Sequence, residues 1–239
     1  MNYLILVRHG QSEWNLENRF TGWVDVGLAP KGKLEACKAG ELIKEQKINL
    51  DYFFTSYQKR AMSTLKLILN TLRINDTKII KAWQLNERHY GSLTGLNKDE
   101  MKKKLGEKKV HEFRRSWNIS PDPLNKNNPY HPINIEAYKD VPRKNIPDTE
   151  SLKDTYDRVF PYFKKEVLNK LEGNKNILIS AHGNSLRAMC KYLFKLDELK
   201  ITKLEIPTGN PLFIIFNEKN EITKCHYLDK ERAKDLIVF

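Results

Sequence analysis

The 239-residue sequence has few cysteines and no long hydrophobic run. Its three cysteines, Cys37, Cys190 and Cys225, are an odd number at no spacing typical of a metal site. This pattern argues against a disulfide-stabilised secreted fold, and we expect a cytoplasmic, reducing environment and no metal. The longest apolar runs, Leu4–Val7 and Leu212–Phe216, have the length of strands. They are far shorter than the roughly 18 apolar residues that a membrane span needs.

What the sequence does contain is an excess of positive charge. Lysine and arginine number 42 against 30 acidic residues, which gives a formal net charge of +12. A nucleic acid, an anionic membrane surface or a small polyanionic substrate would each suit this charge, and so would an ordinary lysine-rich surface. The hydrophobic fraction of 40% indicates a globular fold rather than disorder. The first apolar run has no basic leader and is followed at once by Arg8 and His9, unlike a signal peptide.

Alternating strand and helix patterns predict an α/β fold. Short apolar runs predict strands at Tyr3–Val7, Asp51–Ser56, Asn176–Ala181, Leu212–Phe216 and Thr223–Leu228. Apolar residues that recur every three or four positions predict helices within 34–43, 61–72, 152–167 and 186–193, and Pro161 should kink or restart the third of these. We therefore expect a three-layer α/β/α sandwich, with a mainly parallel sheet and helices on both faces, in a single domain over 1–239.

The segment from about 88 to 146 interrupts this alternation. It begins with a lysine-rich helical piece, Lys98–Arg115, and continues into a proline-rich stretch. Six of the 10 prolines fall between Trp117 and Glu150, namely Pro121, Pro123, Pro129, Pro132, Pro142 and Pro147. Because the segment is short and poor in core residues, it is predicted to be an inserted lid over the sheet edge rather than an independent domain.

Two distant segments of the sequence resemble each other. Residues 3–12 and 176–185 each contain an apolar strand followed by His-Gly, an amide and a serine. Each segment places a histidine, His9 or His182, at the carboxyl end of a strand, which is where open α/β sheets bind ligands. Adjacent parallel strands would bring the two imidazoles face to face.

A histidine in that position is suited to phosphoryl transfer. A neutral imidazole is a nucleophile at pH 7, and a hydrogen bond from its second nitrogen to a backbone carbonyl fixes its direction. The transferred group also needs cations around its oxygens. Arg8 beside His9, and Arg60 where the second strand turns into a helix, fit that requirement because a guanidinium matches phosphate geometry. Isolated histidines such as His111 and His131 are more typical of surface or structural positions.

A series of motifs then identifies a family. They are L-V-R-H-G-Q-S-E-W-N (6–15), N-R-F-T-G-W (18–23), L-N-E-R-H-Y-G (85–91), G-L-N-K (95–98), R-R (114–115), A-H-G-N-S-L-R (181–187) and I-P-T-G (206–209). In this order they resemble the cofactor-dependent phosphoglycerate mutases of the histidine phosphatase superfamily. The resemblance extends from Leu4 to about Leu228, whereas R-H-G alone would indicate only the superfamily.

The resemblance implies roles for individual residues. His9 would be the phosphorylated nucleophile, with Arg8, Arg60 and His182 around the phosphoryl group and Glu87 as the general acid/base. The residues expected to bind the ligand are Ser12, Asn15, Thr21, Gly22, Tyr90, Lys98, Arg114, Arg115, Gly183 and Asn184. From the residues alone, Glu87 could equally be a surface carboxylate paired with Arg88.

The resemblance also implies a reaction and its cofactor. The activity would be interconversion of 3-phosphoglycerate and 2-phosphoglycerate in glycolysis and gluconeogenesis, through a phosphohistidine primed by 2,3-bisphosphoglycerate and without a metal. That bisphosphate carries a charge of about −5, which Arg8, Arg60, Lys98, Arg114 and Arg115 nearly match. Relatives of this kind are often dimers or tetramers, so we expect a homo-oligomer.

The sequence departs from the family pattern at two places. Family members commonly carry a longer tail, rich in Ala, Gly and Lys, that helps to close the site. Here only Asp229–Phe239 follows Leu228, so we expect weaker exclusion of water and a higher ratio of phosphatase to mutase activity. Alternatively, Leu236–Phe239 docks on the body or on a neighbouring subunit. Asn210 stands where the family usually has Val or Ile, and the sequence gives no consequence for it.

Two other functions are compatible with parts of the sequence. A phosphomonoesterase of the same superfamily would use His9 with water as the final acceptor, although Lys98 and the Arg114–Arg115 pair suggest a second anion site. A nucleic-acid-binding protein could use the basic segment Lys98–Arg115. That segment has few aromatic residues and is interrupted by Asp99, Glu100, Glu107 and Glu112. We therefore expect phosphoglycerates as partners, and neither nucleic acid nor a membrane.

Overall fold

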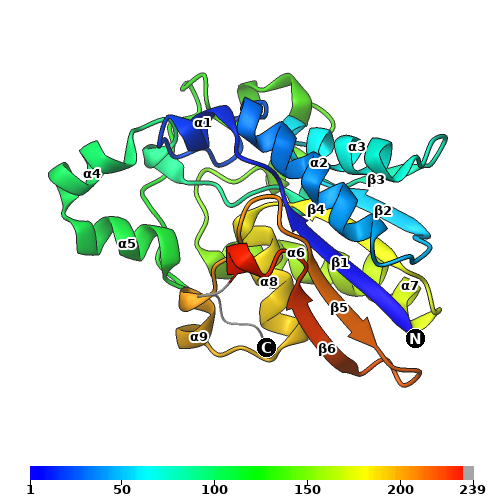
Figure 1. Ribbon diagram of the computed structural model, residues 1–239. Helices are drawn as coiled ribbons and strands as arrows, with labels where there is room; N and C mark the ends of the chain where they lie inside the picture. The colour runs from blue at the N-terminus through cyan, green and yellow to red at the C-terminus, as the bar shows by residue number, and fades with distance from the viewer. Residues whose placement is uncertain (234–239) are drawn as a thin grey trace.

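The computed structural model describes residues 1–233, in which six strands form one mixed sheet (Figure 1). The strands are β1 (Asn2–Arg8), β2 (Tyr52–Thr55), β3 (Ile79–Lys81), β4 (Ile177–Ala181), β5 (Leu212–Phe216) and β6 (Ile222–Tyr227). Their order is β3-β2-β4-β1-β5-β6; the first four are mutually parallel, and β5 and β6 pair antiparallel. The mainly parallel α/β sheet predicted from the sequence is therefore confirmed, with an antiparallel pair at one edge.

The strand β3 was not predicted from the sequence. β3 has only three residues, none of them buried, so its apolar run is too short to differ from a loop.

The helices are α1 (Glu13–Leu16), α2 (Pro30–Lys44), α3 (Lys59–Leu72), α4 (Lys98–Leu105), α5 (Glu107–Arg115), α6 (Leu152–Tyr162), α7 (Asn169–Glu172), α8 (Gly183–Leu193) and α9 (Glu198–Lys203). Short 3-10 helices lie at 83–85, 91–93, 132–134, 136–138, 143–145 and 231–233.

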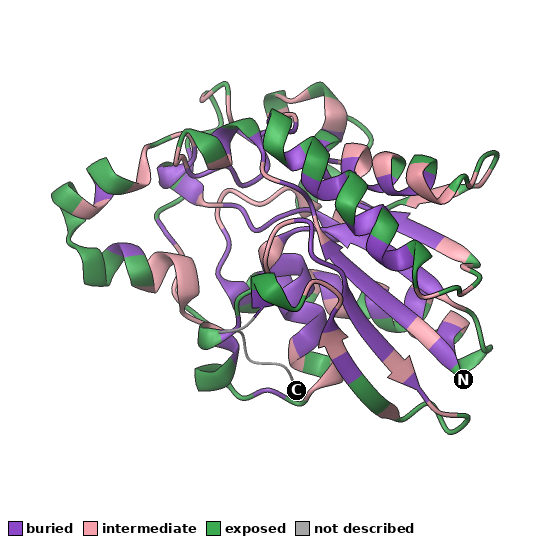
Figure 2. Cartoon of the chain, viewed as in Figure 1, coloured by how far each residue is buried: buried purple, intermediate pink, exposed green. Residues whose placement is uncertain are grey.

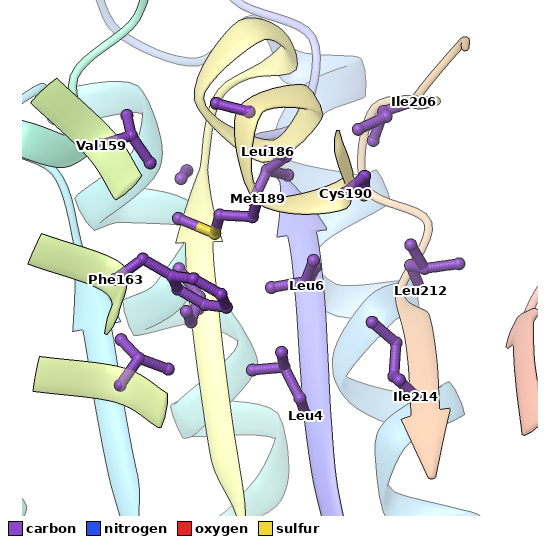
Figure 3. Packing of buried hydrophobic residues seen from close by; sticks show 14 of the residues in the cluster. Leu4, Leu6, Val159, Phe163, Leu186, Met189, Cys190, Ile206, Leu212 and Ile214 are labelled. Carbon is purple, nitrogen blue, oxygen red and sulfur yellow. The ribbon is translucent and has the colours of Figure 1, made fainter. Parts of the chain in front are cut away.

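The sheet divides the hydrophobic core into two layers because successive strand residues point to opposite faces. Leu4 and Leu6 of β1 pack with α6 and α8, whereas Ile5 and Val7 pack with α2 and α3. Figure 3 shows the first layer, in which Leu4 and Leu6 lie near Phe163. Burial of each such side chain contributes about 1.5–3 kcal/mol. Figure 2 shows the result, with mostly buried central strands between helices whose outer faces are exposed.

Pro161 changes the helix without ending it. α6 continues past Pro161 to Tyr162 and leads directly into a π-helical segment, Phe163–Leu168, and then into α7. Proline has no N–H to donate to the preceding turn, so the regular hydrogen-bond ladder is interrupted there. The predicted kink or restart thus takes the form of a wider turn, which still buries Phe163 and Val167 in the core.

The predicted helical piece Lys98–Arg115 is two helices rather than one. Gly106 separates α4 from α5 with a φ of 85°, a conformation that favours glycine. Figure 1 shows both helices projecting away from the sheet. Val110 of α5 and Met101 of α4 pack on Phe20 and Leu93, which ties the two helices to the loop after α1 and to the 3-10 helix at 91–93. The inserted lid remains a prediction.

Asn210 holds the segment that follows β6 through two hydrogen bonds. Its side-chain Nδ2 donates to the carbonyl of Asp229 at 2.9 Å, and its Oδ1 accepts from the N–H of Asp229 at 3.0 Å. Three residues after Asp229, Arg232 forms an ion pair with Glu35 at 3.6 Å. A valine could make neither hydrogen bond, so the asparagine at this position stabilises the chain after β6. The predicted docking of Leu236–Phe239 lies outside the described residues.

Within residues 1–233, no helix is both long and apolar enough to cross a membrane.

The substitution Asn210→Val should lower the free energy of unfolding by about 1–3 kcal/mol, because both hydrogen bonds to Asp229 are lost and two backbone groups are left without their partner. Urea denaturation followed by circular dichroism measures this. Asn70→Ala, at an exposed position of α3, is the control and should change the value by less than about 0.5 kcal/mol. Equal stability of Asn210→Val and the wild type would show that the amide does not fasten the chain.

Candidate active site

The two histidines that end β1 and β4 lie side by side. The strands are parallel neighbours with Arg8 opposite Ala181, so the residues that follow, His9 and His182, emerge next to each other. Their ring centroids are 5.0 Å apart at an angle of 61°, and both residues are buried. The predicted juxtaposition is confirmed, although the rings meet at an angle and not face to face.

The hydrogen bonds of His9 fix its tautomer. Nδ1 lies 2.7 Å from the carbonyl oxygen of Gly10, and a carbonyl only accepts, so Nδ1 carries the hydrogen. Nε2 is therefore the nitrogen that carries no hydrogen, and it accepts a hydrogen bond from Nε of Arg60 at 3.3 Å. Burial, followed by the positive charges of Arg60 and Arg8, holds the pKa of His9 well below its usual value. The imidazole is neutral at pH 7, which a nucleophile requires.

His182 is held by a residue that the sequence analysis missed. Its Nε2 lies 2.8 Å from the hydroxyl of Ser56, which follows β2 and accepts from the N–H of Gln58 at 3.1 Å. Burial, followed by Arg60 and His9, keeps the pKa of His182 well below its usual value. Its Nδ1 has no hydrogen-bond partner among the described residues. The only sequence signal for Ser56 was its place at the end of a predicted strand.

Arg60 is oriented by backbone carbonyls. Its terminal nitrogens donate to the carbonyls of Val24 and Gly22, each at 2.8 Å. Gly22 adopts a φ of +56°, and a Cβ there would lie 3.2 Å from the backbone nitrogen of Tyr90. The loop can therefore approach closely, and the guanidinium is directed toward His9 before any ligand arrives.

Glu87 lies inside the site and not on the surface. It is 8% exposed, and its Oε1 accepts from the N–H groups of Asn184 at 3.1 Å and Arg88 at 2.8 Å. A Cβ on Gly183 would lie 3.7 Å from Glu87 Oε2 and 3.6 Å from Arg8 Nε. The alternative of a surface Glu87–Arg88 pair is wrong, because the Arg88 guanidinium donates instead to the carbonyl of Phe113 at 2.7 Å.

Two contiguous cavities hold most of the predicted residues. The inner cavity, about 70 Å³, is lined by Arg8, His9, Asn15, Arg19, Phe20, Thr21, Gly22, Arg60, Glu87, Tyr90, Lys98 and Arg114. The outer cavity, about 170 Å³, is lined by Arg8, Glu87, Tyr90, Arg114, Arg115, Gly183, Asn184, Arg187, Glu205 and Ile206. The four shared residues, Arg8, Glu87, Tyr90 and Arg114, join them. A separate, larger hollow of about 710 Å³, bordered by Tyr156 and Phe216, contains none of the predicted site residues.

Ser12 and His182 are the predicted residues that line neither cavity. The His182 ring contacts the His9 ring, with centroids 5.0 Å apart. Ser12 is fully buried at the start of α1, where its hydroxyl accepts from the N–H of Asn15 and its own N–H donates to the Asn15 side chain, each at 3.2 Å. This reciprocal capping positions Asn15, which does line the inner cavity. Contact of Ser12 with a ligand stays a prediction.

The site includes residues to which the sequence analysis gave no role. Arg19 and Arg187 lay within the recognised motifs but were not singled out, whereas Glu205 had only its place before I-P-T-G as a signal. Arg187 is 2% exposed, and its Nε has no partner among residues 1–233. Burial, followed by Arg115 and Arg88, lowers the pKa of Arg187 to about 9. A buried guanidinium with a free donor is suited to an anionic ligand.

The sequence is similar to one family model and to known proteins. A sequence model of the histidine phosphatase superfamily (branch 1) matches residues 4–128 and 125–224. The chain is 70% identical to a 2,3-bisphosphoglycerate-dependent phosphoglycerate mutase of Pelagibacter ubique (strain HTCC1062), over 100% of both chains. It is 50% identical to a protein of the same name from Caulobacter sp. (strain K31), over 99% of this chain and 98% of that one.

Solved structures show the same fold at low sequence identity. A mycobacterial glucosyl-3-phosphoglycerate phosphatase superposes with a TM-score of 0.68 at 18% identity, over 95% of this chain and 97% of that one. The alpha-ribazole phosphatase from Shigella flexneri has a TM-score of 0.64 at 19% identity, over 91% and 92% of the two chains. The predicted α/β class is thus confirmed by independent structures.

Phosphate binding should depend on the protonation of Lys98. Burial is the main cause that lowers the pKa of Lys98 to about 8; Tyr90 opposes this decrease, and the positive charges of Arg114 and Arg8 add to it. The ammonium is present below pH 8 and lost above it, so the dissociation constant of inorganic phosphate should rise about tenfold between pH 7.5 and 9.5. Isothermal titration calorimetry measures this.

The matched variant is Lys98→Arg, whose guanidinium keeps its charge through this range and should remove most of the rise. Identical pH profiles for the wild type and Lys98→Arg would show that Lys98 does not titrate at the site.

Proposed function

Because the chain belongs to the histidine phosphatase superfamily (branch 1), and within it to the 2,3-bisphosphoglycerate-dependent phosphoglycerate mutases, we propose that it interconverts 3-phosphoglycerate and 2-phosphoglycerate in glycolysis and gluconeogenesis. One observation carries the proposal: His9, whose Nε2 carries no hydrogen, lines a cationic inner cavity that continues into a second cationic cavity. A ligand with an anionic group at each end fits such a pair of cavities.

The site residues fit 2,3-bisphosphoglycerate. Arg8, Arg60, Lys98, Arg114 and Arg115 line the two cavities and oppose the ligand charge of about −5. In the described part of the chain, the buried Nε of Arg8 has no partner, which suits an additional anionic oxygen. When bound, this cofactor supplies the phosphoryl group that first loads the nucleophile.

His9 acts as the nucleophile through Nε2. Its Nδ1–H bond to Gly10 fixes the ring, and its neutral state leaves a lone pair on Nε2, which would bond to phosphorus in place of its hydrogen bond from Arg60. Arg60 donates toward the same nitrogen, and Arg8 and His182 lie beside it, so negative charge on the phosphoryl oxygens would be met by donors already in place. On transfer, the P–N bond to His9 breaks as a P–O bond to the substrate hydroxyl forms.

Glu87 is the general acid/base for that hydroxyl. The N–H groups of Asn184 and Arg88 hold Oε1, which leaves Oε2 for the substrate. Glu87 lines both cavities, so it can reach a hydroxyl held between them. It takes the proton as the phosphoryl group leaves His9 and returns it in the reverse transfer.

The remaining assignments concern the setting of the enzyme. We place it in the cytoplasm as a homo-oligomer that acts on small phosphoglycerates. The thiols of Cys37, Cys190 and Cys225 are free in the described structure, which supports a reducing environment. No group of three or more His, Cys, Asp or Glu residues within 1–233 is arranged to hold a metal.

Substitution of His9 by alanine should reduce kcat for 3-phosphoglycerate by at least about 10³-fold, because the phosphoryl acceptor is lost. A coupled assay of 2-phosphoglycerate formation, with and without added 2,3-bisphosphoglycerate, measures this. His111→Ala, at an exposed position of α5, is the control and should keep wild-type activity. Wild-type phosphate release without isomerisation would instead assign the chain to the phosphomonoesterases.

Glu87→Gln should reduce kcat by about 10²- to 10⁴-fold with little change in KM, because the amide can keep the hydrogen bonds from Asn184 and Arg88 but cannot take a proton. Steady-state kinetics gives both constants. A large rise in KM at unchanged kcat would assign Glu87 to binding and not to proton transfer.

A further inference from the structure

Glu205 is a carboxylate in a cavity that is otherwise rich in arginine. Arg8, Arg114, Arg115 and Arg187 all line the outer cavity, and Glu205 joins Glu87 as its second acidic residue. Whereas Glu87 is engaged by two backbone N–H groups, Glu205 forms an ion pair with Arg115. The pair links the last residue of α5 to the loop before β5.

The backbone around Glu205 is held firmly. Its carbonyl accepts from the hydroxyl of the buried Tyr227 at 3.1 Å, and the carbonyl of Ile206 accepts from Arg8 at 2.8 Å. The flanking Leu204 and Ile206 are buried. Only the Glu205 side chain extends outward, with 49% of it exposed, so the carboxylate can give up Arg115 without movement of the loop.

Glu205 and a ligand anion would compete for the Arg115 guanidinium. It is 19% exposed and lines the outer cavity, where a ligand anion would meet it, yet in this structure its charge is matched by Glu205. A partly exposed ion pair of this kind is weak, so a ligand phosphate or carboxylate can displace it. Because the ion pair has to break when the ligand binds Arg115, part of the free energy gained at Arg115 is lost.

We propose that Glu205 is a displaceable counter-ion of Arg115 that weakens the binding of ligands whose second anionic group enters the outer cavity. This inference rests on the proposed function, because that function supplies a ligand with two anionic ends. Glu205 acts on affinity and not on the chemical step, since it borders only the outer cavity and lies apart from His9. A ligand with a single phosphate at His9 does not encounter it.

The test is the substitution Glu205→Gln, which keeps the shape of the side chain and removes its charge. We expect the dissociation constant of 3-phosphoglycerate, measured by isothermal titration calorimetry, to fall by about two- to fivefold. The dissociation constant of inorganic phosphate should stay within about 1.5-fold of the wild type. Glu218→Gln, in the exposed turn between β5 and β6, makes the same change in net charge and should leave both constants unchanged.

The mechanism is tested by a double-substitution cycle. If Glu205 acts by holding Arg115, the effect of Glu205→Gln should shrink to less than about 1.5-fold in an Arg115→Gln background. The proposal is overturned if Glu205→Gln leaves 3-phosphoglycerate binding unchanged or weakens it. It is also overturned if inorganic phosphate binding tightens equally, because the charge would then act on the whole site.

Binding and turnover separate this inference from the proposed function. Wild-type protein that binds 3-phosphoglycerate but does not isomerise it would contradict the mutase assignment, while the Glu205 effect on binding could still be measured. Normal isomerisation, with no change in binding on Glu205→Gln, would contradict the role of Glu205 alone.

Discussion

The site depends on the in-register parallel pairing of β1 with β4. With Arg8 opposite Ala181, the next residue of each strand is a histidine, and the two imidazoles come within 5.0 Å between centroids. A shift of one residue would turn one imidazole to the other face of the sheet, because side chains alternate along a strand. The alternating core residues Leu4, Ile5 and Leu6 fix the register, so the packing of the two hydrophobic layers also sets the catalytic geometry.

Burial gives those histidines their chemistry. An exposed imidazole would titrate near neutral pH, but here burial and the surrounding arginines keep both rings neutral. The guanidinium of Arg60 is in turn anchored by carbonyls of the loop between α1 and α2. Positive charge is therefore concentrated around a neutral nucleophile, an arrangement that favours attack on a phosphate whose own negative charge needs to be offset.

The second cavity distinguishes this site from a simple phosphate pocket. Arg114 and Arg115 arrive on α5, which is joined to the body by contacts such as that of Arg88 with the carbonyl of Phe113. Glu205, on the loop before β5, forms an ion pair with Arg115. The balance of arginines and carboxylates in this cavity governs how firmly the distal end of a ligand is held, separately from the reaction at His9.

The sequence by itself determined five of the six strands and the strand ends that carry His9 and His182, and its resemblance to a family gave most of the residues that line the site. These follow from hydrophobic periodicity and from ordered motifs, which are local patterns. It could not give β3, whose three half-buried or exposed residues resemble a loop, nor the break at Gly106, nor the π-helical turn after Pro161.

Only the tertiary structure decided which polar groups find partners across long stretches of chain. The hydrogen bond of Ser56 to His182, the clasp of Asn210 on Asp229 and the ion pair of Arg115 with Glu205 each join segments that are distant in sequence. No periodicity encodes such contacts, because they exist only once the strands and helices have packed. The physical reason is that a local pattern specifies which face of an element is buried, whereas a polar pair depends on the position of two elements relative to each other.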